Sequence, residues 1–224
     1  MNKTYDKLTD FFHCKVETFA RKKLNYSEAN LLILTMNEGR LKNEYPEIWN
    51  NILSCVTNRD SRTPMEYARD VVSSWVFEDY FVKKVKSLKI KDFDIELSGG
   101  DKERNFLNTQ KVSGSSDTFV RYKDKSTKLE IVNDYTGFWY KTKMLHLRNH
   151  KYQKLKNENA LLLGVVICNA KYILLNMTDD NLQTKHIESH KMFGGKEAEQ
   201  IDLDRSDFHD FLIKDIIENI IAIM

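Results

Sequence analysis

Apolar residues recur every three or four positions through the first 62 residues, a spacing that predicts helices. The recurring positions are Leu8, Phe11, Phe12, Val16, Leu31, Leu32, Leu34 and Met36. The polar stretch TNRDSR at 57–62 follows them and is typical of a subdomain boundary. We therefore predict two parts, a helical N-terminal extension over 1–62 and a second domain over 63–224.

The second domain is predicted to begin with a long helix that ends near Leu88. Thr63 and Glu66 have the spacing of a capping box, and Pro64 fits the first helical turn. Short segments of strand character follow, two of them joined by a charged turn at 123–126. The predicted strands are 92–97, 118–122, 127–133, 160–169 and 171–177, of which the last two are predicted to pair as a hairpin.

Two further helices complete the predicted elements. One covers about 142–157, and the other is capped by Ser206 and carries an apolar stripe toward the C-terminus. Helices and strands in this order favour an α/β fold in which helices flank a mixed sheet.

Composition adds little that is specific. Hydrophobic residues make up 41% of the chain, charged residues 30%, and the net charge is +2, which describes an ordinary globular protein. We find neither an apolar run long enough to span a bilayer nor a secretory signal, so no membrane association is expected. The three cysteines are widely spaced, as in a protein of the reducing cytoplasm, so the expected location is cytoplasmic.

The hairpin carries the candidate chemistry. Asp117 precedes its first strand, and Glu130 lies within its otherwise apolar second strand. Two carboxylates on adjacent strands repel each other unless a cation lies between them. Hard oxygen ligands favour Mg²⁺ or Mn²⁺, and the backbone carbonyl of Ile131 is a further candidate ligand. The alternative for Glu130 is an edge strand on which its side chain faces water.

This arrangement resembles the PD-(D/E)xK nuclease superfamily, which includes many restriction endonucleases. The sequence SSD at 115–117 stands at the family's Pro-Asp position, and LEIV at 129–132 stands at its (Asp/Glu)-x-Lys position. The resemblance covers roughly 63–177 and implies a restriction-endonuclease-like mixed sheet with Asp117 and Glu130 as metal ligands. It also implies a third acid on the first helix, for which Glu78 is the candidate and Asp79 the alternative.

The sequence departs from the motif at Val132, where the family has lysine. Some members of the superfamily, including cap-snatching nucleases of segmented RNA viruses, carry this lysine on the following helix. By that analogy Lys143 is the first candidate for the catalytic lysine. Lys151 is the second, because it shares a helical stripe with apolar residues, and Lys141 is a weaker third.

Aromatic and basic residues alternate in YTGFWYKTKMLHLRNHKY at 135–152. Arg148, Lys154 and Lys141 are candidates to contact nucleic-acid phosphates, although a basic helix face exposed to solvent gives the same pattern. His146 and His150 have i,i+4 spacing but lack the glutamate of H-E-x-x-H, which argues against zinc.

The expected function is therefore a Mg²⁺- or Mn²⁺-dependent endonuclease that hydrolyses phosphodiester bonds in DNA, such as a type II restriction endonuclease. The expected partner is double-stranded DNA, and the expected assembly is a homodimer. Two alternatives stay open, an RNA endonuclease of the cap-snatching type and a catalytically inactive nucleic-acid-binding protein. Val132 is the main argument for the inactive protein.

Overall fold

The computed structural model describes residues 3–55, 62–99, 102–104, 116 and 118–224. The chain divides into two compact units. The first contains Met1–Tyr80 and Gly100–Ser113, and the second contains Phe81–Gly99 and Gly114–Met224. The sequence predicted a boundary at 62/63, whereas the units meet at Tyr80 and Phe81, inside a helix.

The first unit is helical throughout its described elements, as the spacing of its apolar residues predicts. Its elements are α1 (Lys3–Phe12), α2 (Val16–Phe19), the π-helix η1 (Ala20–Leu24), α3 (Glu28–Leu34), α4 (Glu38–Glu44), α5 (Pro46–Cys55) and the first part of α6 (Pro64–Ser87). Leu8, Val16 and Leu32 are buried in its core.

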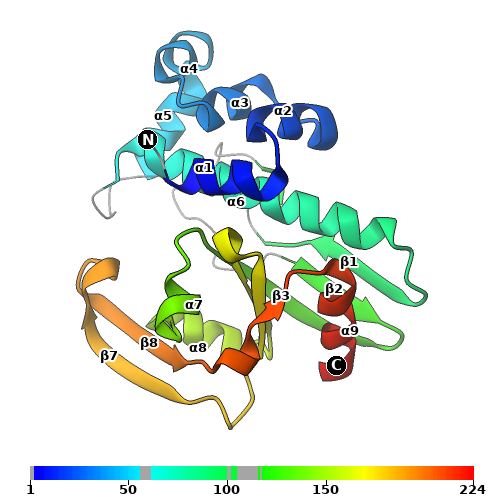
Figure 1. Cartoon of the computed structure of the whole chain (residues 1–224). Coiled ribbons are helices and arrows are strands. Elements are labelled where there is room, and N and C mark those ends of the chain that lie inside the picture. The colour runs from blue at the N-terminus through cyan, green and yellow to red at the C-terminus, as the bar shows by residue number, and fades with distance from the viewer. Residues whose placement is uncertain (1–2, 56–61, 100–101, 105–115, 117) are drawn as a thin grey trace. The chain divides into compact units, whose positions relative to one another are not determined.

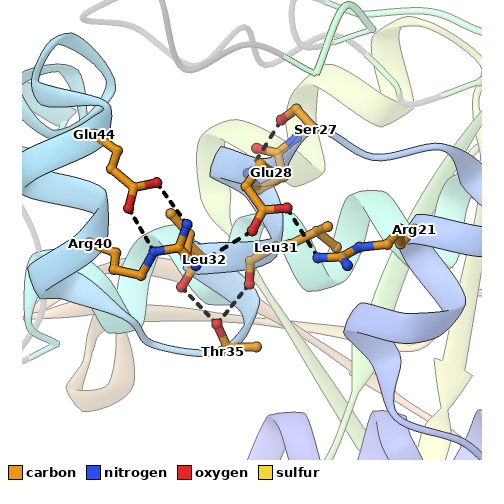
Figure 2. Close-up of polar contacts among 9 residues, drawn as sticks. Arg21, Ser27, Glu28, Leu31, Leu32, Thr35, Arg40 and Glu44 are labelled. Atoms are coloured by element: carbon orange, nitrogen blue, oxygen red, sulfur yellow. Dashed lines mark hydrogen bonds and ion pairs between the residues drawn. The ribbon is translucent and has the colours of Figure 1, made fainter.

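Ion pairs join α3 to the neighbouring helices of this unit. Glu28 contacts Arg21 at 3.0 Å and Arg40 at 3.7 Å, and Arg40 also pairs with Glu44 on α4 (Figure 2). All four side chains are well exposed, so solvent screens these pairs and they add little to stability.

Helix α6 begins as the capping-box spacing predicts. The backbone N–H of Thr63 donates to Glu66 Oε2 at 2.8 Å, and the N–H of Glu66 donates to Thr63 Oγ1 at 3.2 Å. The predicted helix near 63–88 is confirmed.

The second unit contains a six-stranded sheet (Figure 1). Its strands are β1 (Phe93–Leu97), β2 (Thr118–Tyr122), β3 (Lys125–Asp134), β5 (Leu161–Val166), β6 (Lys171–Asn176) and β9 (His209–Asp210), in the order β1-β2-β3-β5-β6-β9. β3 and β5 run parallel, whereas the other neighbours pair antiparallel. The predicted mixed sheet and both predicted hairpins are confirmed.

A three-stranded sheet in the same unit was not predicted. It has the order β4-β8-β7 and consists of β4 (Met144–Arg148), β7 (Thr184–His190) and β8 (Lys196–Asp202). The predicted helix over 142–157 is therefore wrong in part, because α7 (Phe138–Thr142), β4 and α8 (Asn149–Asn157) share that region. The pattern MLHLR alternates, and its two leucines are buried on one face of β4 as in a strand.

One apolar cluster packs α8 against both sheets. It includes Leu145 of β4, Leu155 of α8, Leu162 of β5 and Ile201 of β8, all fully buried. The last helix, α9 (Ile213–Ile223), begins seven residues after Ser206, so the predicted cap is wrong. Ser206 lies instead in a short 3₁₀ turn that Asp204 caps.

Within the described ranges, no helix combines the length and apolar character needed to cross a bilayer. The described helices and strands together form a mixed α/β structure.

Candidate active site

Glu130 is buried near the middle of the six-stranded sheet. It lies opposite Leu162 in the parallel pairing of β3 and β5, and it is 4% exposed. Paired residues share a sheet face, so Glu130 points to the face where Leu162 packs with Tyr152 and Leu155 of α8. The alternative of an edge strand with Glu130 facing water is therefore wrong.

Lys151 supplies a close positive charge to this carboxylate. Its Nζ lies 2.5 Å from Glu130 Oε1, and the two side chains are 23% and 5% exposed. Lys151 belongs to the first turn of α8, and Leu155, one turn later, is fully buried. The lysine stem therefore follows the buried face of the helix while its ammonium reaches the carboxylate of β3.

The other two candidate lysines have different surroundings. Lys143 has a left-handed backbone with a φ of 61°, and its Nζ donates to the carbonyl of Tyr140 at 2.5 Å. The same ammonium lies over the rings of Tyr140 and Phe208 at 4.1 and 4.4 Å. Lys141 is exposed on the last turn of α7. The structure thus brings Lys151 to Glu130 and directs Lys143 to an aromatic pair.

Asp117 lies outside the described residues. The described pairing of β2 with β3 ends at Thr118 and Leu129, which are the sequence neighbours of Asp117 and Glu130. Thr118 Oγ1 donates to the carbonyl of Leu129 at 3.0 Å and fixes this end of the ladder. Ile131 is buried beside Glu130. Among the described residues, no three His, Cys, Asp or Glu side chains form a group that could hold a metal ion.

Glu78 and Asp79 belong to an ion-pair network of the first unit. Arg104 contacts Glu78 Oε2 and Asp79 Oδ1, both at 2.8 Å. The Tyr26 hydroxyl donates to Asp79 Oδ2. Burial, followed by the charge of Asp79, raises the pKa of Tyr26 far above its usual value. The predicted metal ligand Glu78 therefore has an arginine partner, and this network ties Arg104 to α6.

Asp134 has a structural role that the sequence analysis missed. Its carboxylate accepts hydrogen bonds from the N–H groups of Thr136, Gly137 and Trp139 at 2.8 to 3.0 Å, and from the Thr136 hydroxyl. These bonds organise the turn into α7. The spacing of the acid before Thr-Gly is typical of such a side-chain turn and was available in the sequence.

The predicted phosphate-binding residues lie on three different elements, Lys141 on α7, Arg148 on β4 and Lys154 on α8. Arg148 ends β4, and its guanidinium lies 5.6 Å from the ring of Phe193. Lys154 lies on α8 at 3.9 Å from Glu158. His146 lies on β4 and His150 on α8, so their predicted helical spacing is wrong.

The arrangement has defined chemical abilities. A buried carboxylate can ligate a hard cation, and an ammonium beside it can orient a water molecule or an anionic oxygen. Strand β3 positions the carboxylate, and the first turn of α8 positions the ammonium. Searches of protein-family models, curated proteins and solved structures find no match to this chain.

Proposed function

We propose that the chain is a metal-dependent nuclease that hydrolyses phosphodiester bonds in DNA. The contact between Lys151 and Glu130 carries this proposal. An acid on the third strand of a meander and a lysine on the following helix are the two groups that the resemblance to PD-(D/E)xK nucleases implies for a member with a displaced lysine. Two polar groups are costly to bury in an apolar layer, so a catalytic role accounts for their retention.

The order of elements supports the proposal. α6, the meander β1-β2-β3, α8 and β5 follow one another as in the core implied by the resemblance, with α7 and β4 inserted before α8. We propose on this basis that the mixed sheet is of the restriction-endonuclease-like type.

A divalent metal is part of the proposal, with Asp117, Glu130 and the carbonyl of Ile131 as its ligands. The donors are hard oxygens and fit Mg²⁺ or Mn²⁺ in type. When bound, such an ion lowers the pKa of a water molecule and offsets charge on the phosphate. Lys151 would hold the attacking water by a hydrogen bond, and its charge would favour the anionic transition state. Glu78 belongs to the first unit, where it contacts Arg104.

The position of Lys151 also favours one alternative activity. A lysine on the following helix is the arrangement found in cap-snatching nucleases, so an RNA endonuclease is the alternative activity. An inactive protein is the third possibility, in which Glu130 and Lys151 form a structural ion pair.

The test is cleavage of plasmid DNA, duplex oligonucleotides and single-stranded RNA with Mg²⁺, Mn²⁺ or EDTA. We expect metal-dependent cleavage that falls at least 100-fold in Glu130→Gln, Asp117→Asn and Lys151→Met. Lys156→Met is the matched control, because Lys156 is an exposed lysine on the same helix. Absence of cleavage of all three substrates, together with absence of Mn²⁺ binding by calorimetry, would overturn the proposal. RNA cleavage without DNA cleavage would select the second candidate.

A further inference from the structure

The three-stranded sheet has two chemically different faces. Leu145 and Leu147 of β4 and Ile201 of β8 point into the apolar core. His146 and Arg148 alternate with these leucines and therefore lie on the opposite face. His146 and Arg148 are not part of this core, and both are half-buried.

Four rings form a continuous row on this outer face, and we call Phe138, His146, His190 and Phe193 the ring row. The ring centroids of Phe138 and His146 are 6.0 Å apart, those of His146 and His190 4.5 Å, and those of His190 and Phe193 4.8 Å. The guanidinium of Arg148 lies over Phe193 at the end of the row. Chain segments far apart in sequence, α7 with β4 and the β7–β8 hairpin, thus supply adjacent rings.

His190 lies in the middle of the row, between His146 and Phe193. Burial, and then the charge of His146, lower the pKa of His190 below its usual value. His146 Nε2 lies 3.2 Å from Gln200 Oε1 across the strand pair. The His190 ring therefore continues the row of packed rings and supports Phe193, which lies at its end.

Basic side chains lie near the end of the row, together with the exposed acids Glu188 and Glu197 of the same hairpin. Lys191 precedes Phe193 in the β7–β8 connection, Lys196 begins β8, and both are exposed. Lys185 of β7 lies opposite Gln200 in the strand pairing with β8, and its side chain is also exposed. Met192, next to Phe193, is 66% exposed and adds apolar surface. Acidic Asp202 lies at the other end of β8, where Gln200 donates to it.

We propose that the ring row binds single-stranded nucleic acid, with a base stacked on Phe193 at its end and phosphates against Arg148 and the neighbouring lysines. The inference takes nucleic acid as its partner from the proposed function. Rings stack on bases of any sequence, whereas duplex bases are already stacked on each other and cannot reach a flat sheet face. The row would hold an unpaired strand outside the centre formed by Glu130 and Lys151.

The test is fluorescence anisotropy with a fluorescein-labelled dT₁₂ probe and the full chain, in EDTA so that cleavage does not interfere. Phe193→Ala should raise the Kd at least fivefold, since one lost base stack is worth about 1–3 kcal/mol. Phe193→Trp keeps a stacking surface and should hold the Kd within about twofold. Tyr122→Ala is the matched control, because Tyr122 is a half-buried ring with a lysine 5.0 Å away on β2, outside the row.

The outcomes separate this inference from the proposed function. Binding of dT₁₂ that falls in Phe193→Ala but not in Tyr122→Ala supports the ring row, even if no substrate is cleaved. Binding that is equal in all variants, or that a duplex of the same length matches, would overturn the ring row and leave the nuclease proposal intact. An equal loss in Phe193→Ala and Phe193→Trp would also overturn it, because stacking would then not be the cause.

Discussion

Replacing Lys151 by methionine tests the central contact of the molecule. The change keeps most of the apolar stem and removes the ammonium that lies 2.5 Å from Glu130. Removing one partner of a fully buried ion pair costs about 3–5 kcal/mol. Because the Lys151 side chain is 23% exposed, water compensates in part, and we expect a loss of about 2–3 kcal/mol.

Urea unfolding followed by circular dichroism measures this loss. With a slope of ~2 kcal/mol/M, the midpoint should fall by about 1 M. Lys154→Met is the control, because Lys154 lies on the same helix but at 3.9 Å from Glu158, and its loss should cost less than about 1 kcal/mol. In a double-mutant cycle, Glu130→Gln with Lys151→Met should reveal a coupling above ~1 kcal/mol.

The reasoning is refuted if Lys151→Met is as stable as Lys154→Met and the coupling is near zero. Lys151→Arg then separates stability from catalysis. It keeps the positive charge and should restore most of the stability. The wider guanidinium cannot hold a water in the same position, so nuclease activity should stay low.

Three further predictions concern the second unit. Gly137→Ala should lower stability by about 1–3 kcal/mol in a thermal melt, because φ is +76° and the new Cβ would lie 2.7 Å from Asn169 Oδ1; an unchanged Tm would contradict the tight turn. Asp134→Ala should cost about 2–4 kcal/mol by urea unfolding through the loss of the bonds that organise α7, and a cost below ~0.5 kcal/mol would show that water replaces them. The hydrogen bond to Glu199 raises the pKa of His186 above its usual value of 6.5, so the pair stabilises the protein below pH 6.5 and the effect is lost as pH rises through the raised pKa. An NMR titration should show this pKa return toward 6.5 in Glu199→Gln, and an unchanged titration would show that the contact does not form in solution.

The strands of the six-stranded sheet follow from local patterns in the sequence. β2 and β3 follow from alternation around a charged turn, and the apolar run at Leu161–Val166 is long enough for a strand buried on both faces. The capping box at Thr63 was visible for the same reason, because it depends on residues three positions apart.

The region around Lys151 could not be predicted in this way. Met144, Leu147 and Leu155 happen to match helical spacing, although the first two lie in β4. Strand β8 has few apolar residues, and it becomes a strand by pairing with β4, about 50 residues earlier, and with β7. Strand pairing between segments so far apart in sequence depends on the tertiary fold, so a local sequence pattern does not predict it. The choice between Lys143 and Lys151 depended on this misassigned segment.

The two partners of the ion pair between Glu130 and Lys151 belong to elements that differ in the free energy of local unfolding. Glu130 lies on β3, which is hydrogen-bonded to the fully buried strand β5, so its backbone amides should exchange with solvent only in global unfolding. Lys151 lies on a helix of nine residues, in its first turn, where local opening costs far less free energy. The ammonium can therefore leave the carboxylate by fraying of α8 while the sheet stays intact. Native-state hydrogen exchange should show fast exchange at the start of α8 and strong protection in β3. The carboxylate of Glu130 would then keep its position while the ammonium of Lys151 moves away from it and returns through local opening of α8.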